Sequence, residues 1–534
     1  MWLLITCLVN LCVFVFGQTN PKVLTLNGRV DGLRGDDFNM FLGVPYALVD
    51  ETRPFGPAIT PPVSTRIIYA IRDPVLCPQN VNGIPQGHIQ CLHLNIYTPH
   101  NVTSKSKLPV MVYLHGGGFV SGNGKFETFS PKHLIKHNVI VVTVNYRLGI
   151  FGFLCLPDSE ISNQGLKDQK LALKWVKSNI HMFGGNFKNI LLFGHSAGSI
   201  SAELQLLYNK DQDLDKFILQ SGPAVSPLML LPPAGEEYMR KLSRKLRLNV
   251  ENKTVDEMLS KLSDTSNNLL TSATYGDEFR PCIDGKFIKT TPTVNVKNKK
   301  IMIGNTDREM LFFHQDAPLL KMMVASILKN TTAVNMPSAY KPADASDSVL
   351  NFGNDLFFDH PISRSVRYYS ENGANVYKYL FTYEGERNYV KVRDHIKGAG
   401  ATHGDELGYI FDTDLFAKTI KSSDQILIDD MTAMWTNFAY HGNPTPPNSS
   451  IVTTDNATLI WPSVDSSKKI LHIGNIIKVE DDTFNNRTAF WTNFYKGTAI
   501  KGIDFGDMAP SSASSNTASV VVALALCIVK FLQF

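Results

Sequence analysis

The sequence predicts an α/β fold in which one large, mostly parallel central sheet is flanked by helices within a single domain. Short runs rich in Val, Ile and Leu end abruptly at Gly, Ser or Asn, and they alternate with longer segments of helical period. No internal repeat is visible, and no Pro- or Ser-rich linker interrupts residues 20–500. The chain has 534 residues, of which 43% are hydrophobic, so it can bury a large core.

The predicted strands follow one another along the chain as residues 110–114, 139–144, 190–193, 217–219 and 301–303. Their unbroken apolar character is typical of strands that a parallel sheet buries on both faces. A segment of helical period, residues 166–180, separates the second strand from the third. Because open α/β sheets gather their chemistry in loops at the carboxyl ends of the strands, we expect the functional residues there.

Charge and composition exclude several classes of function. The formal net charge is +4, and Lys and Arg are scattered among nearly as many acidic residues. A protein that binds nucleic acid needs a basic stripe or patch, so we expect no nucleic-acid partner. No CxxC motif or His cluster indicates a zinc site, and we expect neither a metal nor a cofactor.

The N-terminal end resembles a secretion signal. Residues 1–17 form an apolar run that ends in small or branched residues, which predicts a signal peptide and a mature chain that begins at Gln18. The alternative is a buried first helix, since no basic residue precedes Leu3. Secretion agrees with six Asn-x-Ser/Thr glycosylation sites: Asn101, Asn252, Asn330, Asn448, Asn456 and Asn486.

Three of the seven cysteines lie in the predicted signal peptide and in the C-terminal tail, which we also expect to be removed. The other four are Cys77, Cys91, Cys155 and Cys282. Three connectivities exist for four cysteines, and the sequence does not choose among them. The short loop from Cys77 to Cys91 is the simplest pair in an oxidising compartment. We therefore predict only that bridge, and the pairing of Cys155 and Cys282 stays open.

The globular domain is expected over residues 18–500, and residues 501–534 form a tail of different character. Small residues and a polar spacer give way to an apolar end. This order is typical of a glycosylphosphatidylinositol (GPI) attachment signal, for which Ser511 or Ser512 would carry the lipid. A retained transmembrane helix is the weaker alternative because the apolar stretch is short and contains Lys530, and a free secreted form is the third.

The candidate nucleophile is Ser196, in the pentapeptide Gly194-His195-Ser196-Ala197-Gly198. A GxSxG pattern alone is weak evidence, but here a predicted strand leads in and an apolar helical segment, residues 200–208, leads out. A strand, a tight turn and a helix make up a nucleophile elbow, in which flanking glycines avoid crowding of the backbone. The alternative is a serine that only caps the helix.

A second glycine motif follows the strand at residues 110–114. The run His115-Gly116-Gly117-Gly118 lets a loop approach a substrate closely. The amides of Gly117 and Gly118, together with the amide of Ala197, would form an oxyanion hole. A glycine run can also be a flexible turn, but its position directly after a buried strand favours the first interpretation.

A serine nucleophile needs a base and an orienting acid, which in this type of fold follow it in the order acid, then base. Glu309 and Asp307 share the loop after residues 301–303, and spacing does not separate them. His403 lies in a loop of small residues and is a candidate base. The competing histidines are His314, His360, His395 and His441.

Taken together, the motifs resemble the type-B carboxylesterase and cholinesterase family, most closely its insect carboxylesterase branch. The resemblance covers almost the whole chain and rests on eight segments: 41–47 (FLGVPYA), 91–95 (CLHLN), 115–119 (HGGGF), 145–149 (NYRLG), 165–169 (GLKDQ), 183–185 (FGG), 194–198 (GHSAG) and 435–438 (WTNF). It implies the α/β-hydrolase fold, selects Glu309 as the acid and His403 as the base, and likens Ser221 to a serine near the acid.

The resemblance implies two-step acyl transfer on a small-molecule ester, without a cofactor. Choline esters are poor candidates, because the loop from Cys77 to Cys91 contains no Trp and His195 stands where cholinesterases have an acid. General carboxylic esters are the expected substrates of a secreted or surface-anchored enzyme. The alternatives are a non-catalytic adhesion or scaffolding member of the same fold and a slow ester scavenger, and the oligomeric state is open.

Overall fold

The computed structural model describes residues 19–156, 159–210, 214–226, 229–230, 235–277, 279–316, 345–449, 451, 458–464, 468–496 and 503–505. Its central feature is an 11-stranded sheet. The strands of this sheet are β3 (Leu33–Arg34), β4 (Asn39–Pro45), β8 (His93–Thr98), β9 (Leu108–Leu114), β10 (Ile140–Val144), β11 (Gly185–His195), β12 (Lys216–Gln220), β13 (Lys300–Thr306), β14 (Asn375–Phe381), β15 (Lys469–Ile473) and β16 (Ile477–Asp481).

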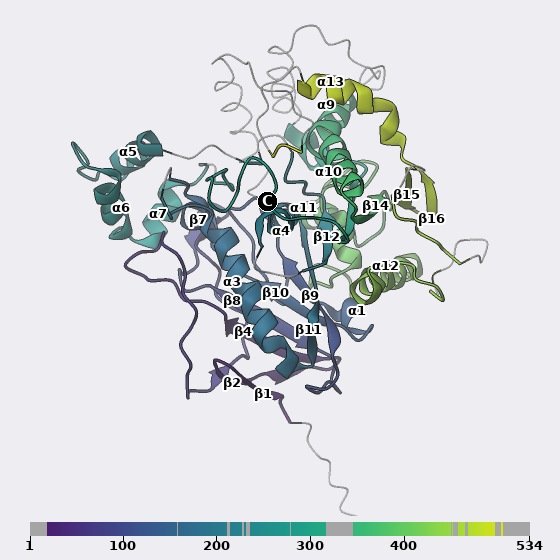
Figure 1. Cartoon of the computed structure of the whole chain (residues 1–534), viewed down its shortest axis with the longest axis horizontal. Helices are drawn as coiled ribbons and strands as arrows, with labels where there is room; N and C mark the ends of the chain where they lie inside the picture. Colours follow the sequence, from purple (N-terminus) through teal and green to yellow (C-terminus); the bar gives the residue numbers. More distant parts are fainter. Residues whose placement is uncertain are drawn as a thin grey trace, which may run out of the picture.

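The central part of the sheet is parallel. The strand order is β16-β15-β14-β13-β12-β11-β9-β10-β8-β4-β3, and every neighbouring pair from β10 to β15 is parallel. Antiparallel strands extend both margins, with β8, β4 and β3 at one end and β16 at the other. Figure 1 shows β15 and β16 at the right edge of the molecule. The predicted large, mostly parallel sheet is therefore confirmed.

Two small sheets lie outside the central one. The first contains β1 (Lys22–Thr25), β2 (Gly28–Asp31) and β5 (Ile68–Tyr69), and the second pairs β6 (Gln79–Val81) with β7 (Ile84–Gln86). The β6–β7 ribbon belongs to the loop between Cys77 and Cys91. Gln79 of β6 accepts the amide of Gly122 at 2.9 Å, which joins the ribbon to the chain that follows the glycine run 116–118.

The helices are α1 (Lys132–Ile135), α2 (Gly149–Phe153), α3 (Gln164–Asn179), α4 (Ala197–Tyr208), α5 (Gly235–Lys245), α6 (Val255–Ser263), α7 (Asn267–Ala273), α9 (Ala345–Asn354), α10 (His360–Glu371), α11 (Tyr389–Asp394), α12 (Ser422–His441) and α13 (Thr488–Lys496). The three helices α5, α6 and α7 gather at the left of Figure 1, at the opposite end of the molecule from β15 and β16. The predicted helices at residues 166–180 and 200–208 correspond to α3 and α4.

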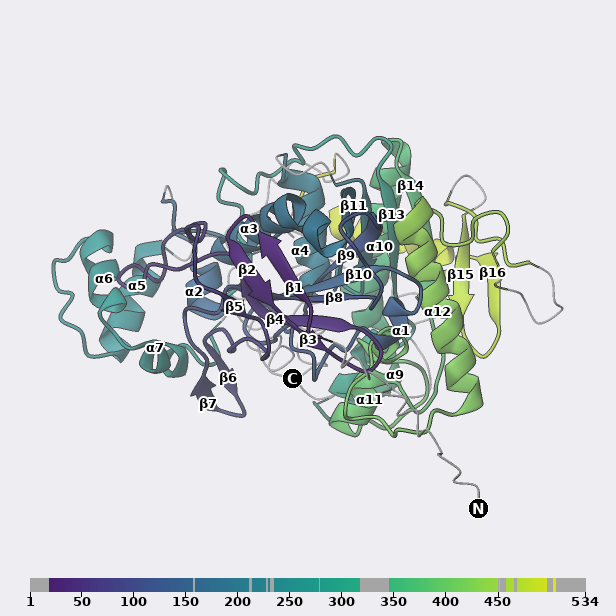
Figure 2. The same ribbon diagram turned by 90° about the horizontal axis from the view of Figure 1, so that it is seen from below.

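Alternate residues of the central strands enter two separate cores, as expected from the two-residue period of a strand. In β9, Val110 and Val112 join the core that contains α3 and α4, whereas Met111 and Tyr113 join the core that contains α1 and α12. Figure 2 shows α12 across the sheet from α3 and α4. Both faces of the sheet are thus covered, which explains why the central strands are apolar throughout.

The loop after β10 is fixed to α3 by a buried ion pair. Arg147 Nη2 lies 2.7 Å from Asp168 Oδ1, and both side chains are 0% exposed. The same guanidinium donates to the carbonyl of Pro54 at 3.1 Å and to the carbonyl of Gly56. A buried charge that is satisfied on all sides can persist in a core, so this pair fixes the segments around it.

The described residues contain two disulfides, the predicted one and a second whose pairing the sequence left open. Cys77 and Cys91 form the expected bridge across 14 residues, with their Cα atoms 5.0 Å apart. Cys155 also bonds to Cys282, across 127 residues, with a Cα separation of 6.4 Å. The second bridge joins the end of the α2 region to the segment before β13. A separation of this size cannot be read from spacing in one sequence.

Several predictions about processing fall outside the described residues: the signal peptide at residues 1–17, the tail with Ser511 and Ser512, and the sites Asn330 and Asn456. The side chain of Asn486 is also not described. The other three glycosylation candidates, Asn101, Asn252 and Asn448, are exposed. Within the described part of the chain, no helix is both long and apolar enough to cross a membrane.

Candidate active site

Ser196 lies at the turn between β11 and α4. Its backbone angles are φ 57° and ψ −125°, a conformation that residues other than glycine rarely adopt. Its amide donates to the carbonyl of Gln220 at 2.8 Å, which ties the turn to the end of β12. The Ser196 side chain makes no capping hydrogen bond to α4, so the structure gives no support to the alternative of a helix cap.

The glycines around Ser196 are required by close backbone contacts. A Cβ atom on Gly198 would lie 1.9 Å from the carbonyl oxygen of Leu114, and one on Gly194 would lie 2.4 Å from the carbonyl of Gly198. On Gly116, a Cβ would lie 3.1 Å from the Cβ of Ser196. The ends of β9 and β11 therefore meet the start of α4 at a distance that only glycine permits.

The loop after β9 has the backbone that its glycines predict. Gly117 and Gly118 have φ values of 101° and 59°. The carbonyl of Gly117 accepts the amides of Val120 at 3.1 Å and Ser121 at 3.0 Å, so the loop closes on itself. A Cβ on Gly117 would lie 2.3 Å from the carbonyl oxygen of Ser121, which excludes a side chain there.

His115 supports this loop rather than taking part in proton transfer. Its ring stacks on Tyr146 with 4.4 Å between centroids, and its Nδ1 lies 2.8 Å from the carbonyl oxygen of Gly116. The Tyr146 hydroxyl donates to the carbonyl of His115 at 2.7 Å. Burial lowers the pKa of His115 to about 4, so the ring is neutral and serves packing.

Glu309 and His403 lie in direct contact. His403 Nδ1 is 2.6 Å from Glu309 Oε2. The other carboxylate oxygen, Oε1, accepts the hydroxyl of Ser221 at 2.6 Å and the amide of Thr306 at 2.8 Å. The Glu309 side chain is 0% exposed and that of His403 is 12% exposed. The carboxylate is therefore fixed in a dry site with one oxygen directed at the imidazole.

Asp307, which spacing could not separate from Glu309, faces a different group. Its Oδ1 accepts the amide of Ala401 at 2.8 Å, two residues before His403. Burial raises the pKa of Asp307 to about 6. Asp307 thus holds the loop that carries His403. Among the described residues, the carboxylate that contacts the His403 imidazole is that of Glu309.

The loop that carries His403 is fixed at several further points. Thr402 donates its amide to Asp405 Oδ2 at 2.7 Å and accepts the amide of Phe312 through its hydroxyl at 3.0 Å. Asp405 Oδ1 accepts the amide of Lys391 at 2.9 Å, which joins the loop to α11. Sequence reasoning missed these anchors, since short polar side chains in a loop carry no distinctive pattern.

A pocket of about 380 Å³ of empty space brings the candidates together. Ser196, Gly118, Ala197 and His403 all line it, and Gly117 is not among its lining residues. The apolar part of the wall consists of Phe119, Ile200, Pro223, Met229, Phe357 and Phe358, and the other lining residues are Ser221, Gly222, Ser226 and Arg280. Apolar walls with a few polar groups are typical of sites for small organic ligands.

His195 lies beside the candidate base. Its ring centroid is 4.5 Å from that of His403, and the residue is 6% exposed. Burial lowers the pKa of His195 well below its ordinary value, and the nearby charges of His403 and Arg393 lower it further. The ring is therefore neutral at physiological pH, so position 195 contributes no charge beside His403.

The competing histidines lie elsewhere. His360 begins α10 and its ring lies 6.0 Å from that of Trp491. His395 directly follows α11, and His441 ends α12. The side chain of His314 is outside the description.

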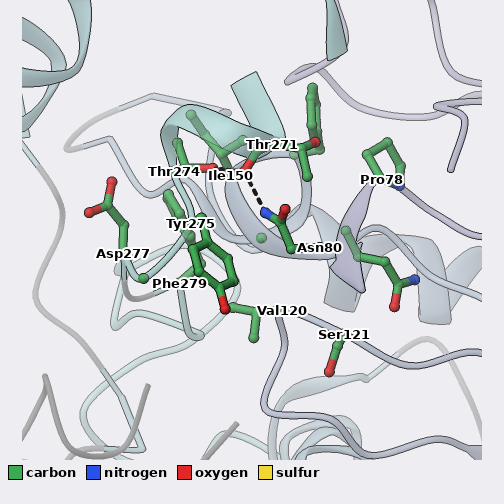
Figure 3. Close-up of a pocket in the computed structure, with 14 residues that line it drawn as sticks. Pro78, Asn80, Val120, Ser121, Ile150, Thr271, Thr274, Tyr275, Asp277 and Phe279 are labelled. Atoms are coloured by element: carbon green, nitrogen blue, oxygen red, sulfur yellow. Dashed lines mark hydrogen bonds between the residues drawn. The ribbon is translucent and has the colours of Figure 1, made fainter. Parts of the chain in front are cut away.

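A second cavity, with about 580 Å³ of empty space, lies next to the end of the glycine loop (Figure 3). It is lined by Val120 and Ser121, which follow the glycine loop, and by Tyr275, Asp277 and Phe279. Figure 3 also shows Asn80, which donates to the carbonyl of Thr271 at 2.7 Å and so joins the β6–β7 ribbon to α7.

The described residues include no group of three or more His, Cys, Asp or Glu side chains that could hold a metal ion.

Comparison with known proteins places the chain in a family. A model of the carboxylesterase family matches residues 19–491. Similar proteins include neuroligin-2 of Mus musculus (29% identical over 92% of this chain and 72% of that protein) and juvenile hormone esterase of Tribolium castaneum (28%, over 90% and 94%). Bile salt-activated lipase of Rattus norvegicus is 30% identical over 87% of this chain and 84% of its own length. The chain therefore belongs to the carboxylesterase family and has its α/β-hydrolase fold.

Proposed function

We propose that this protein is a serine carboxylesterase that hydrolyses small carboxylic esters through an acyl-enzyme intermediate. The observation that carries the proposal is the 2.6 Å contact between Glu309 Oε2 and His403 Nδ1, with His403 and Ser196 on the wall of one apolar pocket. A serine is activated for attack on an ester when a carboxylate orients an imidazole and the imidazole takes the proton of the serine hydroxyl.

In the proposed reaction, His403 takes the proton of the Ser196 hydroxyl while the oxygen attacks the ester carbonyl. Glu309 keeps the imidazole in the tautomer that accepts at Nε2 and stabilises the imidazolium that forms. The amides of Gly117, Gly118 and Ala197 stabilise the oxyanion. His403 then gives the proton to the departing alcohol, and water, activated by the same imidazole, releases the acid and restores Ser196.

Membership of the family is not by itself evidence of ester hydrolysis, because neuroligin-2, whose name is not that of an esterase, is among the relatives. A non-catalytic adhesion or scaffolding protein and a slow ester scavenger are therefore the alternatives. The presence of Ser196 together with the acid and base pair favours catalysis, because a serine hydrolase needs all three groups and a protein that only binds partners does not need the serine.

The direct test compares the secreted wild-type protein with Ser196→Ala on a panel of short and long acyl esters. Wild type should hydrolyse at least one ester, and Ser196→Ala should lose about 10⁴-fold or more in kcat. The matched control is Ser199→Ala, one turn further along α4, whose hydroxyl donates to the carbonyl of Gly222 at 2.9 Å and does not line the pocket. Equal rates in wild type and Ser196→Ala would refute the mechanism.

We also propose that the protein is secreted, carries N-linked glycans and is held at the cell surface by a lipid anchor at Ser511 or Ser512. Two disulfides and the exposure of Asn101 support an extracellular route. A phospholipase specific for the lipid anchor should release the full-length protein from cells. Absence of release would favour a soluble form or a membrane span.

A further inference from the structure

One wall of the proposed active-site pocket comes from an irregular helix. Helices α9 and α10 (Figure 1) are joined directly by a π-helical turn, Asp355–Asp359. Hydrogen bonds in a π turn span one residue more than those of an α-helix, and such turns occur often at functional sites. Two consecutive phenylalanines of this turn, Phe357 and Phe358, line the pocket.

The side chain of Phe358 faces the candidate base. Its ring centroid lies 5.3 Å from that of His403, and Phe358 is 5% exposed. His403 lines the same pocket, so the phenyl ring stands at the pocket wall beside the imidazole. In this position the ring fills space that a longer substrate would need.

The π turn is fixed to the segment that follows β13. Asn354, just before the turn, donates to the carbonyl of Asp307 at 2.9 Å and accepts the amide of Met310 at 2.8 Å. Asp359, at the end of the turn, accepts from Asn305 Nδ2 at 3.0 Å. The wall therefore cannot recede from the pocket without loss of hydrogen bonds in a largely buried site.

Other parts of the turn are anchored as well. Asp355 accepts from Arg487 Nη2 at 2.9 Å and from Trp491 Nε1 at 3.2 Å. The carbonyl of Phe357 accepts the hydroxyl of Ser226, which also lines the pocket, at 2.7 Å. Two walls of the pocket are thus joined to each other. A closely packed wall of this kind discriminates by size, because a substrate cannot push it aside.

The pocket is small and enclosed. Its empty space of about 380 Å³ lies near the lower end of the range for small-molecule sites, which is about 300–1000 Å³. Of its lining residues, all except Met229 and His403 are buried. In the proposed reaction the acyl group stays bonded to Ser196, whereas the alcohol has to depart and be replaced by water. An enclosed pocket at Ser196 therefore suits the acyl group.

We propose that Phe358 makes this site selective for esters of short-chain carboxylic acids, from acetyl to butyryl esters. This inference rests on the proposed esterase function and adds a substrate class to it. An open apolar groove would gain affinity with each added methylene group. A pocket that Phe358 closes instead penalises longer chains, because a chain that meets the ring holds the ester carbonyl away from Ser196.

The kinetic test measures kcat/KM for p-nitrophenyl acetate, butyrate, hexanoate and octanoate. Wild type should prefer butyrate to octanoate by about tenfold or more. Phe358→Ala should raise the ratio of octanoate to butyrate by about tenfold or more. Phe358→Leu removes less volume, should raise the ratio by about threefold, and serves if Phe358→Ala fails to fold. Equal wild-type rates on the two esters, or an unchanged ratio in the variants, would overturn the inference and leave the esterase proposal standing.

Phe312→Ala is the matched control. The ring of Phe312 lies 6.0 Å from that of His403, but Phe312 is not among the lining residues of the pocket. Its loss can change the absolute rate through His403, yet the ratio of octanoate to butyrate should stay within about twofold of wild type. A change in the ratio as large as that in Phe358→Ala would show that the ratio reports disturbance of His403, and would contradict the inference.

A second series of substrates tests which half of the ester enters the pocket. It keeps the butyryl group and lengthens the alcohol from methyl to octyl. Wild type should show no comparable fall in kcat/KM along this series, because the alcohol lies outside the enclosed pocket. A fall in the alcohol series alone would place the alcohol in the pocket and overturn the inference.

A binding measurement separates failure of this inference from failure of the proposed function. In Ser196→Ala, which should not turn esters over, calorimetry gives the dissociation constants of ethyl butyrate and ethyl octanoate. Tighter binding of ethyl octanoate in Ser196→Ala/Phe358→Ala than in Ser196→Ala, with nearly equal affinities for ethyl butyrate, would support the role of Phe358 even if wild type hydrolysed nothing. Equal affinities for ethyl octanoate in the two proteins would overturn it.

Discussion

Glu309 is the residue on which the geometry of the proposed site depends. Its two oxygens have separate tasks, since Oε1 accepts from Ser221 and Thr306 while Oε2 faces His403. With Oε1 held by two donors, the carboxylate cannot rotate without losing hydrogen bonds in a buried site. The orientation of the imidazole is therefore fixed before a substrate binds.

Replacement of Glu309 tests this directly. Glu309→Gln should lower kcat by about 10³ to 10⁴-fold, because an amide can stabilise the wrong tautomer of His403 and cannot stabilise an imidazolium. Asp307→Asn is the matched control: its side-chain oxygen can still accept the Ala401 amide, so kcat should stay within about tenfold of wild type. Steady-state kinetics on one ester compares the three proteins, and a larger loss in Asp307→Asn would reverse the assignment.

The sequence alone could not distinguish these two acids. Both follow β13 by a few residues, so the strand-end rule applies equally to each. What separates them is the path of the loop before His403, which brings Ala401 to Asp307 and the imidazole to Glu309. Such a path depends on contacts between segments about ninety residues apart, and no local pattern encodes it; only the resemblance to a family selected Glu309.

At the scale of elements, the turn between β11 and α4 is tightly constrained. Every residue of α4 is buried, and its first turn touches the ends of β9 and β12. The strained backbone of Ser196 can persist only because these contacts determine it.

The crowding at this turn predicts the effect of a single methyl group. Gly198→Ala should destabilise the protein by about 3 kcal/mol or more and abolish activity, since its Cβ would lie 1.9 Å from the carbonyl oxygen of Leu114. Gly83→Ala is the control for strain without crowding, because a Cβ there meets nothing within 4 Å and only its φ of 79° should cost about 1 kcal/mol. Urea denaturation and ester hydrolysis measure both effects. A Gly198→Ala protein with normal stability would show that the turn is less crowded than described.

Strands β9 to β13 were predictable from the sequence, whereas β14 to β16 and the antiparallel strands at the other end of the sheet were not. Strands β9 to β13 are buried on both faces and appear as short continuous apolar runs between glycines and polar residues. By contrast, β16 is a partly exposed strand with a mixed sequence. Its pairing comes from antiparallel contact with β15, which no periodicity in a single segment reveals.

At the scale of the whole molecule, the bridge between Cys155 and Cys282 joins parts of the chain that are 127 residues apart. A loop closed over that distance restricts the unfolded chain strongly. Its absence from the sequence-based prediction has a physical reason: pairing over long separations follows from the fold, whereas spacing identifies only short loops.

Loss of this bridge should lower stability. Cys155→Ser/Cys282→Ser should reduce the free energy of unfolding by about 2–5 kcal/mol. Thermal denaturation of the double variant, beside wild type under non-reducing conditions, measures the change. An unchanged melting temperature would mean that the bridge does not stabilise the fold.

Buried acids in the interior predict a dependence of stability on pH. Burial, reinforced by the charge of Glu309, raises the pKa of Glu406 from its ordinary value of 4.5 to about 8. The folded state therefore binds this proton more tightly than the unfolded state. Stability from this group is complete below the unfolded pKa and is lost as pH rises toward 8, by up to about 1.4 kcal/mol per pH unit.

Glu406→Gln isolates that contribution. The variant has no carboxyl to ionise, so its stability relative to wild type should improve between about pH 5 and about pH 8. Denaturation by urea at several pH values measures the difference. A constant difference across this range would show that Glu406 ionises normally in the folded protein.

The most direct measurement of the central claim is covalent labelling of the intact protein with a fluorophosphonate, followed by peptide mass spectrometry. Such a reagent reacts with an activated serine and not with an ordinary hydroxyl. The account predicts one adduct per chain, located on Ser196. It predicts no adduct in Ser196→Ala and slower labelling of Ser196 in Glu309→Gln than in wild type. Absence of an adduct in wild type, or an adduct on another residue, would contradict it.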